Sequence, residues 1–199
     1  MTNAKRDALD KIIESFKVKK VEVLYKKQSD KFIQSEAREY VLNNGKKVVR
    51  EQIIKGGKDG SAVIVIPVIN GEILTVIEPR VFTELTVGVG FPAGYIEYGE
   101  DIVTGALREL REETGYVPCE MKLIDSFYQD EGVSSALNHI FLAQGCEKKY
   151  EQQLDKDEIV RYMNFNYEEL FELERLGYIR GGNAKLALAK SRKYIRKER

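Results

Sequence analysis

Residues 94–116, GYIEYGEDIVTGALRELREETGY, constrain this chain of 199 residues more than any other stretch. Apolar side chains recur there at three- and four-residue intervals, which predicts a helix over residues 101–114 with one face toward a core. The residues of that expected apolar stripe are Val103, Ala106, Leu107 and Leu110. Gly115 stands where a left-handed helix C-cap is expected.

Three carboxylates, Glu109, Glu112 and Glu113, fall together beside this stripe. Side chains three and four apart on a helix have Cβ atoms roughly 5–6 Å apart, so these carboxylates repel each other unless a cation lies among them. Arg108 can neutralise only part of their charge. Converging carboxylate oxygens suit Mg²⁺ or Mn²⁺, so the spacing favours a divalent metal site. The alternative is a solvated helix face with ordinary ion pairs.

The same stretch resembles the signature of the Nudix hydrolases, G-x5-E-x7-R-E-U-x-E-E-x-G-U, in which U is a bulky apolar or aromatic residue. Its defined positions are all filled, in order, by Gly94, Glu100, Arg108, Glu109, Leu110, Glu112, Glu113, Gly115 and Tyr116. A solvated face would not require two glycines and a glutamate at these fixed offsets. The resemblance implies an α/β (α+β) Nudix fold, in which a mixed β-sheet is sandwiched between α-helices.

The resemblance also implies roles for individual residues. The implied ligands of Mg²⁺, or of Mn²⁺, are the Ala93 carbonyl, Glu109, Glu112 and Glu113. Glu100 and Arg108 correspond to a pair that holds the loop against the catalytic helix through a charge-assisted hydrogen bond. Gly94 is expected beside the substrate, and Glu113 is expected to be essential for turnover.

The part of the chain before this core is expected to be an extension. Its predicted elements are a helix at 3–16, a strand at 18–26 and two further strands at 38–42 and 46–53. Asn43-Asn44-Gly45 between the last two is a hairpin signal. The glycine-rich break at 55–60 then predicts a boundary. Residues 1–58 are expected to form an N-terminal helix and antiparallel β extension, and residues 59–199 the Nudix hydrolase domain.

An extension of this kind resembles the ADP-ribose/ADP-sugar pyrophosphatase branch of the family. The resemblance implies a homodimer through the N-terminal strands, with a substrate site built from both subunits. Arg50 and Arg80 are candidates for binding the nucleotide or its phosphates, and a surface arginine in a salt bridge is the alternative for each.

One turn departs from the pattern of that branch. Where a Ser-Pro-Gly turn and an acidic residue that recognises adenine are common, residues 128–137 read YQDEGVSSAL and contain no proline. Phe127 and Tyr128 are candidate stacking surfaces for the base. Asp130 and Glu131 are candidates to replace the acidic contact, and an acidic turn in solvent explains them equally well.

The general base has several candidates. Residues 151–158, EQQLDKDE, form an acidic stretch late in the chain, where this branch often supplies a carboxylate from a loop. Asp157 and Asp155 come first, Glu158 is close behind, and Glu112 is a rival within the signature. An acidic surface loop is the alternative interpretation.

Several further elements are expected in the hydrolase domain. They are strands at 61–67, 72–77, 138–143 and 159–165, a turn at Asn70-Gly71, and a helix at 183–199 whose Ala184, Ala187, Leu188 and Ile195 face inward. His139, the single histidine, lies in one of these strands and is expected to be structural rather than catalytic.

Composition bounds the partners and the compartment. Lys plus Arg and Asp plus Glu number 32 each, so no global charge favours nucleic acid or membrane as a partner. Two cysteines, Cys119 and Cys146, are too few for a disulfide framework, and the N-terminus lacks a continuous apolar run. A cytoplasmic protein is therefore expected.

The expected activity is metal-dependent hydrolysis of a pyrophosphate bond in a nucleoside diphosphate linked to another moiety. ADP-ribose or a related nucleotide sugar is the favoured substrate, and the products would be a nucleoside monophosphate and a sugar phosphate. A non-catalytic nucleotide sensor and a triphosphate-cleaning enzyme are the alternatives. The complete signature counts against the sensor, and the N-terminal extension counts against the triphosphate enzyme.

Overall fold

The computed structural model describes residues 2–16, 32–41 and 47–195, so the expected strand at 18–26 and the turn Asn43-Asn44-Gly45 lie outside the described residues. The helices are α1 (Asn3–Phe16), α2 (Ile102–Thr114), α3 (Tyr167–Arg175) and α4 (Gly182–Ile195). The strands are β1 (Ile33–Val41), β2 (Lys47–Lys55), β3 (Ala62–Ile69), β4 (Glu72–Pro79), β5 (Val87–Gly90), β6 (Ala93–Tyr95), β7 (Tyr116–Val117), β8 (Glu120–Tyr128), β9 (Leu137–Gln144), β10 (Glu147–Lys148) and β11 (Arg161–Phe165).

The central sheet runs in the order β11-β4-β3-β9-β8, with β5 paired to β4 and β6 paired to β3. Strands β3 and β9 are parallel and the other pairs are antiparallel, so the sheet is mixed. One face packs against α2, and the other packs against α1, α3 and α4. The expected mixed sheet between helices is therefore confirmed.

Strand β3 shows why its sequence reads as a continuous apolar run. Val63 and Val65 belong to the core on the α2 side, whereas Ile64 and Ile66 belong to the core with α3 and α4. All four side chains are at most 1% exposed. A strand covered on both faces buries consecutive residues instead of alternate ones, which explains the run.

Helix α2 has the expected ends. Asp101 is its N-cap, accepting from the backbone N–H groups of Val103 and Thr104, and Gly115 ends it at a φ of 78°.

The expected apolar stripe of α2 is wrong at two of its four positions, because Val103 is 42% and Leu107 is 38% exposed. The helix is rotated so that its buried face includes Glu113 together with Ala106 and Leu110. Burial of a carboxylate in place of two apolar side chains is not what hydrophobic packing alone would produce.

Several smaller predictions can also be checked. The turn Asn70-Gly71 has positive φ at both residues, as a two-residue hairpin turn requires. Strand β11 begins at Arg161, two residues later than expected. In α4, Ala184, Ala187 and Leu188 are buried as expected and Ile195 is partly buried against the same core, while residues 196–199 lie outside the described part. Helix α3 was not anticipated.

Helix α1 is docked on the domain by apolar and ionic contacts. Leu9 is fully buried and Ile13 is 8% exposed. The Lys5 ammonium donates to Glu72 at 2.8 Å and to Glu169 at 2.9 Å. Among the residues described, no helix has the length and apolar character that crossing a membrane would require.

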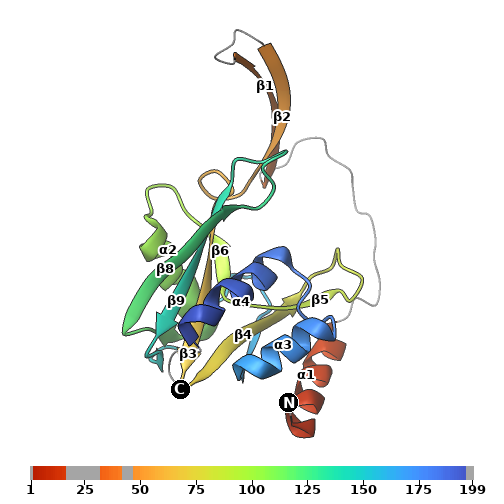
Figure 1. Ribbon diagram of the computed structural model, residues 1–199, viewed down its shortest axis with the longest axis vertical. Helices are drawn as coiled ribbons and strands as arrows, with labels where there is room; N and C mark the ends of the chain where they lie inside the picture. Colours follow the sequence, from red (N-terminus) through yellow and green to blue (C-terminus); the bar gives the residue numbers. More distant parts are fainter. Residues whose placement is uncertain (1, 17–31, 42–46, 196–199) are drawn as a thin grey trace.

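Strands β1 and β2 form an antiparallel ribbon that projects beyond the rest of the molecule (Figure 1). The two expected strands are confirmed where they are described, and both extend further toward the base of the ribbon. That base contacts the domain: the Ile53 N–H donates to the Val133 carbonyl at 2.7 Å, and the Phe32 and Tyr95 rings pack edge to face at 5.7 Å.

Candidate functional site

Arg108 ties the loop before α2 to the helix itself. Its Nε and Nη2 donate to the two oxygens of Glu100 at 2.9 and 3.0 Å, and Nη2 also donates to the Tyr95 carbonyl at 2.9 Å. This forked pairing is the strong, directional kind of ion pair. The hydrogen bond from Arg108 holds the pKa of the Glu100 carboxyl below its usual range.

The same guanidinium also contacts the carboxylates of the helix. Arg108 Nη1 donates to Glu109 Oε1 at 2.7 Å and to Glu112 Oε2 at 3.2 Å. One positive charge therefore faces three carboxylates, those of Glu100, Glu109 and Glu112. The site retains an excess of negative charge near the end of α2.

Glu113 is the most unusual residue of the site. It is 6% exposed, and its Oε2 has no hydrogen-bond partner among the described residues. Burial raises the pKa of its carboxyl well above the ordinary value, and the nearby charges of Glu78 and Glu109 raise it further. A buried carboxylate of this kind calls for a proton or a cation at its unpaired oxygen.

Glu109 lies against the glycine loop. Burial raises the pKa of its carboxyl to about 7, although Arg108 opposes the shift. A Cβ at Gly94 would overlap the Glu109 carboxylate. A side chain at position 94 would therefore displace this carboxylate from its present place, although the backbone angles at Gly94 are ordinary.

Two further carboxylates join this cluster. Burial raises the pKa of Glu78, at the end of β4, and Arg80 only partly offsets the effect. The charge of Glu158 raises the pKa of Glu78, Glu109 and Glu113 alike. Sequence reasoning missed Glu78, although a glutamate at the end of a strand that is otherwise apolar was a usable signal.

The chemistry of this cluster fits a divalent cation. Its donors are hard oxygens, and one buried oxygen of Glu113 lacks any partner. Within residues 2–16, 32–41 and 47–195, no three acidic, histidine or cysteine side chains already form a complete ligand set. Arg108 bonds one oxygen of Glu109 and one of Glu112, and the second oxygen of each carboxylate is not bonded by Arg108. Ligation by Ala93, Glu109, Glu112 and Glu113 stays a prediction.

A cavity of about 390 Å³ opens beside the cluster. Its walls come from β3, β5 and β6, from the end of β4, and from the connection between α3 and α4. The polar and charged side chains that line it are Lys55, Glu78, Arg80, Thr83, Gln129, Asn138, Tyr178, Arg180 and Asn183. Ala93 and Gly94 also line it, so the glycine loop borders both the cavity and the carboxylates.

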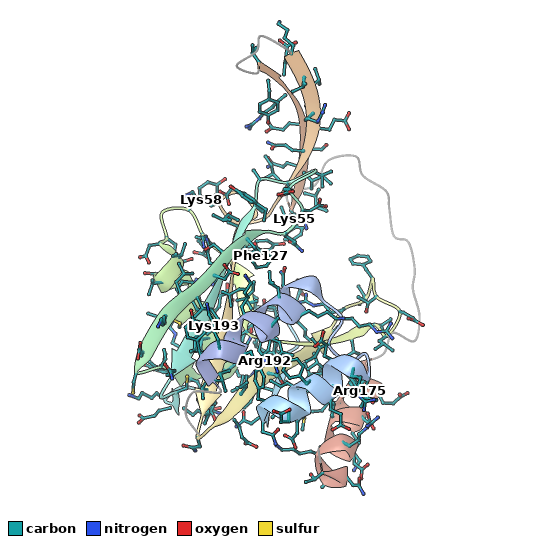
Figure 2. The ribbon with its side chains drawn as sticks, in the orientation of Figure 1. Lys55, Lys58, Phe127, Arg175, Arg192 and Lys193 are labelled. Atoms are coloured by element: carbon teal, nitrogen blue, oxygen red, sulfur yellow. The ribbon has the colours of Figure 1, made fainter. Side chains whose placement is uncertain are left out.

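The structure places some of the candidate substrate-binding residues in the cavity wall and others outside it. Arg80 lines the cavity and pairs with Glu78. Arg50 lies on the projecting ribbon, exposed, with Nη1 on the Val49 carbonyl at 2.8 Å, and does not line the cavity. Phe127 lies near the end of β8 (Figure 2), and Tyr128 is the last residue of that strand. Neither lines the cavity, whereas the next residue, Gln129, does.

The candidate bases Asp155 and Asp157 are exposed in the loop between β10 and β11, outside the cavity wall. The Asp155 N–H donates to Glu158 Oε2 at 3.1 Å, so the loop is partly folded on itself. Of the three candidate bases in this loop, Glu158 is the one whose charge acts on the buried carboxylates.

Sequence reasoning also missed lining residues from several other elements. Lys55 stands at the base of the ribbon (Figure 2), Asn138 on β9, and Tyr178, Arg180 and Asn183 around the start of α4. The motif Gly181-Gly182-Asn183 before a helix was a visible signal for the last group. His139 is not among them: its Nδ1 lies 2.8 Å from Ser126 Oγ, and burial lowers its pKa.

The comparisons with known proteins agree with this geometry. The NUDIX domain family matches residues 58–186, well over half of the chain. An ADP-ribose pyrophosphatase of Bacillus subtilis is 37% identical over 147 residues, covering 73% of this chain and 77% of that protein. A methanol dehydrogenase activator of Bacillus methanolicus is 33% identical over 72% of this chain and 76% of its own length. A crystal structure of an ADP compounds hydrolase superposes with a TM-score of 0.72 at 20% identity, covering 85% of this chain and 90% of that chain.

Proposed function

This chain belongs to the Nudix family and is a pyrophosphatase of that family, and from this premise we propose that it hydrolyses ADP-ribose or a related nucleotide sugar with the help of a divalent metal. The bond cleaved is the pyrophosphate, and the products are a nucleoside monophosphate and a sugar phosphate. The substrate class is supported by the relative named an ADP-ribose pyrophosphatase and by the extension that precedes the signature.

The observation that carries the metal dependence is Glu113, whose buried carboxylate has an unpaired oxygen beside Glu109 and Glu78. Glu109, Glu112, Glu113 and the Ala93 carbonyl would hold Mg²⁺, with Mn²⁺ as the other candidate. When bound, the metal would neutralise pyrophosphate charge and acidify a water molecule.

The remaining roles belong to the protein. Arg108 and Glu100 hold the loop at Gly94 in place, so that backbone can approach the diphosphate. Arg80 and Lys55 line the cavity and supply positive charge for the phosphates. Glu112, whose side chain is 31% exposed and lies next to the cluster, is the alternative base, and in that role it would not be a ligand of the metal. Asp155, Asp157 and Glu158 stay candidates through movement of their loop.

We also infer a homodimer formed through the β1–β2 ribbon. Support comes from apolar side chains that the ribbon exposes: Ile33, Tyr40, Val41, Val49 and Ile53. Arg50, which lies on the ribbon and outside the cavity of its own chain, would then be available to the site of the partner. A cytoplasmic location and the division at residues 58 and 59 stay predictions.

The activity is tested with a substrate panel in ¹⁸O-labelled water with Mg²⁺ or Mn²⁺. The panel contains ADP-ribose, ADP-glucose, GDP-mannose, NADH, dinucleoside polyphosphates and nucleoside triphosphates. We expect ADP-ribose or another nucleotide sugar to be cleaved fastest, with the label in one of the two monophosphate products. That label identifies the phosphorus attacked.

Other outcomes would assign the protein differently. Preferred cleavage of a triphosphate would replace the nucleotide-sugar assignment. Binding of a panel member without turnover, seen as a higher melting temperature, would favour a nucleotide sensor. Activity that persists after complete removal of divalent ions by EDTA would contradict the metal dependence.

A further inference from the structure

Asn138 and Asn183 both line one side of the cavity, and a hydrogen bond joins their side chains. Asn138 on β9 is 1% exposed, and its Oδ1 accepts the Ala62 N–H at 3.1 Å. Its Nδ2 in turn faces Asn183 Oδ1 at 3.5 Å. A backbone N–H can only donate, so the contact with Ala62 sets the orientation of the first amide, and the first amide sets that of the second.

The result is a wall that offers donors to the cavity. Each amide oxygen already accepts one hydrogen bond, and none of the hydrogen bonds formed among the described residues uses the Nδ2 group of Asn183. The backbone N–H groups of Gly182, Asn183 and Ala184 lie in the first turn of α4, where a helix has no carbonyl to offer them. The complementary ligand group is therefore one rich in acceptor oxygens.

This wall lies in the interior of the molecule. Asn138 and Ala184, which both line the cavity, are 1% and 8% exposed. The hydroxyl and ring oxygens of a sugar can accept hydrogen bonds from these donors, and so can the ring nitrogens of adenine. The choice between the two groups therefore rests on their distance from the diphosphate.

The sheet sets the distance from this wall to the carboxylates. Strands β9 and β6 flank β3 on opposite sides, with Val63 paired to both His139 and Gly94. Asn138 therefore lies two strand spacings, roughly 10 Å, across the sheet from the glycine loop. That span suits a sugar joined to a diphosphate that rests beside Gly94 and Glu109.

We propose that the Asn183 amide, oriented by Asn138, hydrogen-bonds an oxygen of the sugar at the far end of the diphosphate and so selects sugar-bearing substrates. This role rests on the proposed function and adds the residue that binds the non-nucleotide half of the substrate. Asn138 acts through Asn183 and is a positioning residue.

The test compares wild-type protein with Asn183→Leu and Asn183→Ala. Leucine removes the amide at a similar side-chain volume, and alanine removes it at a smaller one. The control is Lys185→Gln on the same helix, since the Lys185 ammonium pairs with Glu174 and does not line the cavity. The two substrates are ADP-ribose and the β-methyl ester of ADP, which keeps the nucleotide and the pyrophosphate but lacks the second sugar. Melting temperatures with ribose 5-phosphate and with AMP provide a readout of binding alone.

For both amide-free variants we expect kcat/KM for ADP-ribose to fall about tenfold, mostly through KM, as the loss of one or two hydrogen bonds implies. The methyl ester should be cleaved within about twofold of the wild-type rate, and stabilisation by ribose 5-phosphate should be lost while that by AMP persists. Equal losses on both substrates, no loss, or loss of the AMP response instead would overturn the assignment.

Failure of the proposed function and failure of the proposed role of Asn183 give different results. If the wild-type protein cleaves neither substrate, the proposed function fails. The ribose 5-phosphate experiment then decides the role of Asn183 alone, and a wild-type protein that this ligand does not stabilise would contradict it.

Discussion

At the scale of one residue, Glu113 is the side chain on which the proposed chemistry depends most. Folding removes its carboxylate from water, and no hydrogen bond satisfies Oε2. Stability alone would favour a neutral side chain at this position, because burial of an unpaired charge is unfavourable. Retention of the acid is understandable if its charge is needed when cation and substrate are bound.

Replacing Glu113 by Gln is therefore expected to separate activity from stability. We expect kcat to fall by orders of magnitude, while the melting temperature of the metal-free protein is unchanged or higher. The comparison variant is Glu97→Gln, an exposed position in the same loop region, which should change neither quantity. Retained turnover in purified Glu113→Gln protein would remove this residue from the mechanism.

Gly94 gives a second prediction at this scale. A methyl group there would overlap the Glu109 carboxylate, so Gly94→Ala should push loop and helix apart. We expect Mg²⁺ affinity, measured by calorimetry, to fall about tenfold or more, since misplaced ligands typically lose that much. Gly71→Ala is a useful comparison, because a Cβ there meets no atom within 4 Å, although its positive φ adds some backbone strain. Unchanged Mg²⁺ affinity in Gly94→Ala would contradict the proposed metal site.

At the scale of elements, the pairing of Arg108 with Glu100 joins a loop to a helix. Lysine at position 108 would keep the charge but lose the fork that contacts both oxygens of Glu100 and the Tyr95 carbonyl. Arg108→Lys should therefore increase amide hydrogen exchange over residues 95–100 and lower kcat about tenfold. Arg111→Lys on the same helix serves as control. Unchanged exchange in the loop would show that other contacts hold it.

Helix α1 depends on an ion pair whose pH dependence can be derived. Burial raises the pKa of Glu169, but the hydrogen bond from Lys5, helped by one from the Asn166 N–H, keeps it below its usual range. A lowered pKa means that this stabilisation is present above the unfolded value, about 4.3, and is lost as pH falls through the folded value. The pKa of Lys5 is raised, because the hydrogen bonds that its ammonium donates to Glu72 and Glu169 outweigh burial, so its contribution lasts to pH 10.5 and above.

Lys5→Met should accordingly lower the free energy of unfolding by about 1 kcal/mol at pH 7, measured by urea denaturation. The difference from wild type should shrink below about pH 4, as Glu169 becomes protonated. Lys11→Met, at an exposed position of the same helix, should show no such pH-dependent difference. A penalty that is constant from pH 3 to pH 8 would mean that Lys5 stabilises through its contact with the Phe165 ring rather than through its carboxylate partners.

At the scale of the whole molecule, the ribbon is the feature that a single copy does not explain. It projects from the body and carries exposed apolar side chains on both strands (Figure 1). Two-stranded ribbons are marginally stable alone, so a second surface that covers this one is expected.

The double variant Val41→Lys and Val49→Lys should therefore convert a dimer to a monomer in light scattering coupled to gel filtration. The two side chains are 65% and 59% exposed, so the fold of the domain should be unaffected. Val103→Lys, at an exposed apolar position of α2, is the control and should leave the oligomeric state unchanged. A wild-type protein that is monomeric at all concentrations would exclude the ribbon dimer.

The sequence alone determined the family, the helix that carries the signature, its C-cap glycine, the buried strands and the hairpin, because each depends on local spacing or on residues with one strong conformational preference. It could not determine the rotation of α2, which placed Glu113 in the interior and Val103 and Leu107 in solvent. Nor could it place Glu78 beside Glu113, or Asn138 beside Asn183. Those pairs are distant along the chain, and only the packing of strands and helices decides which distant side chains meet.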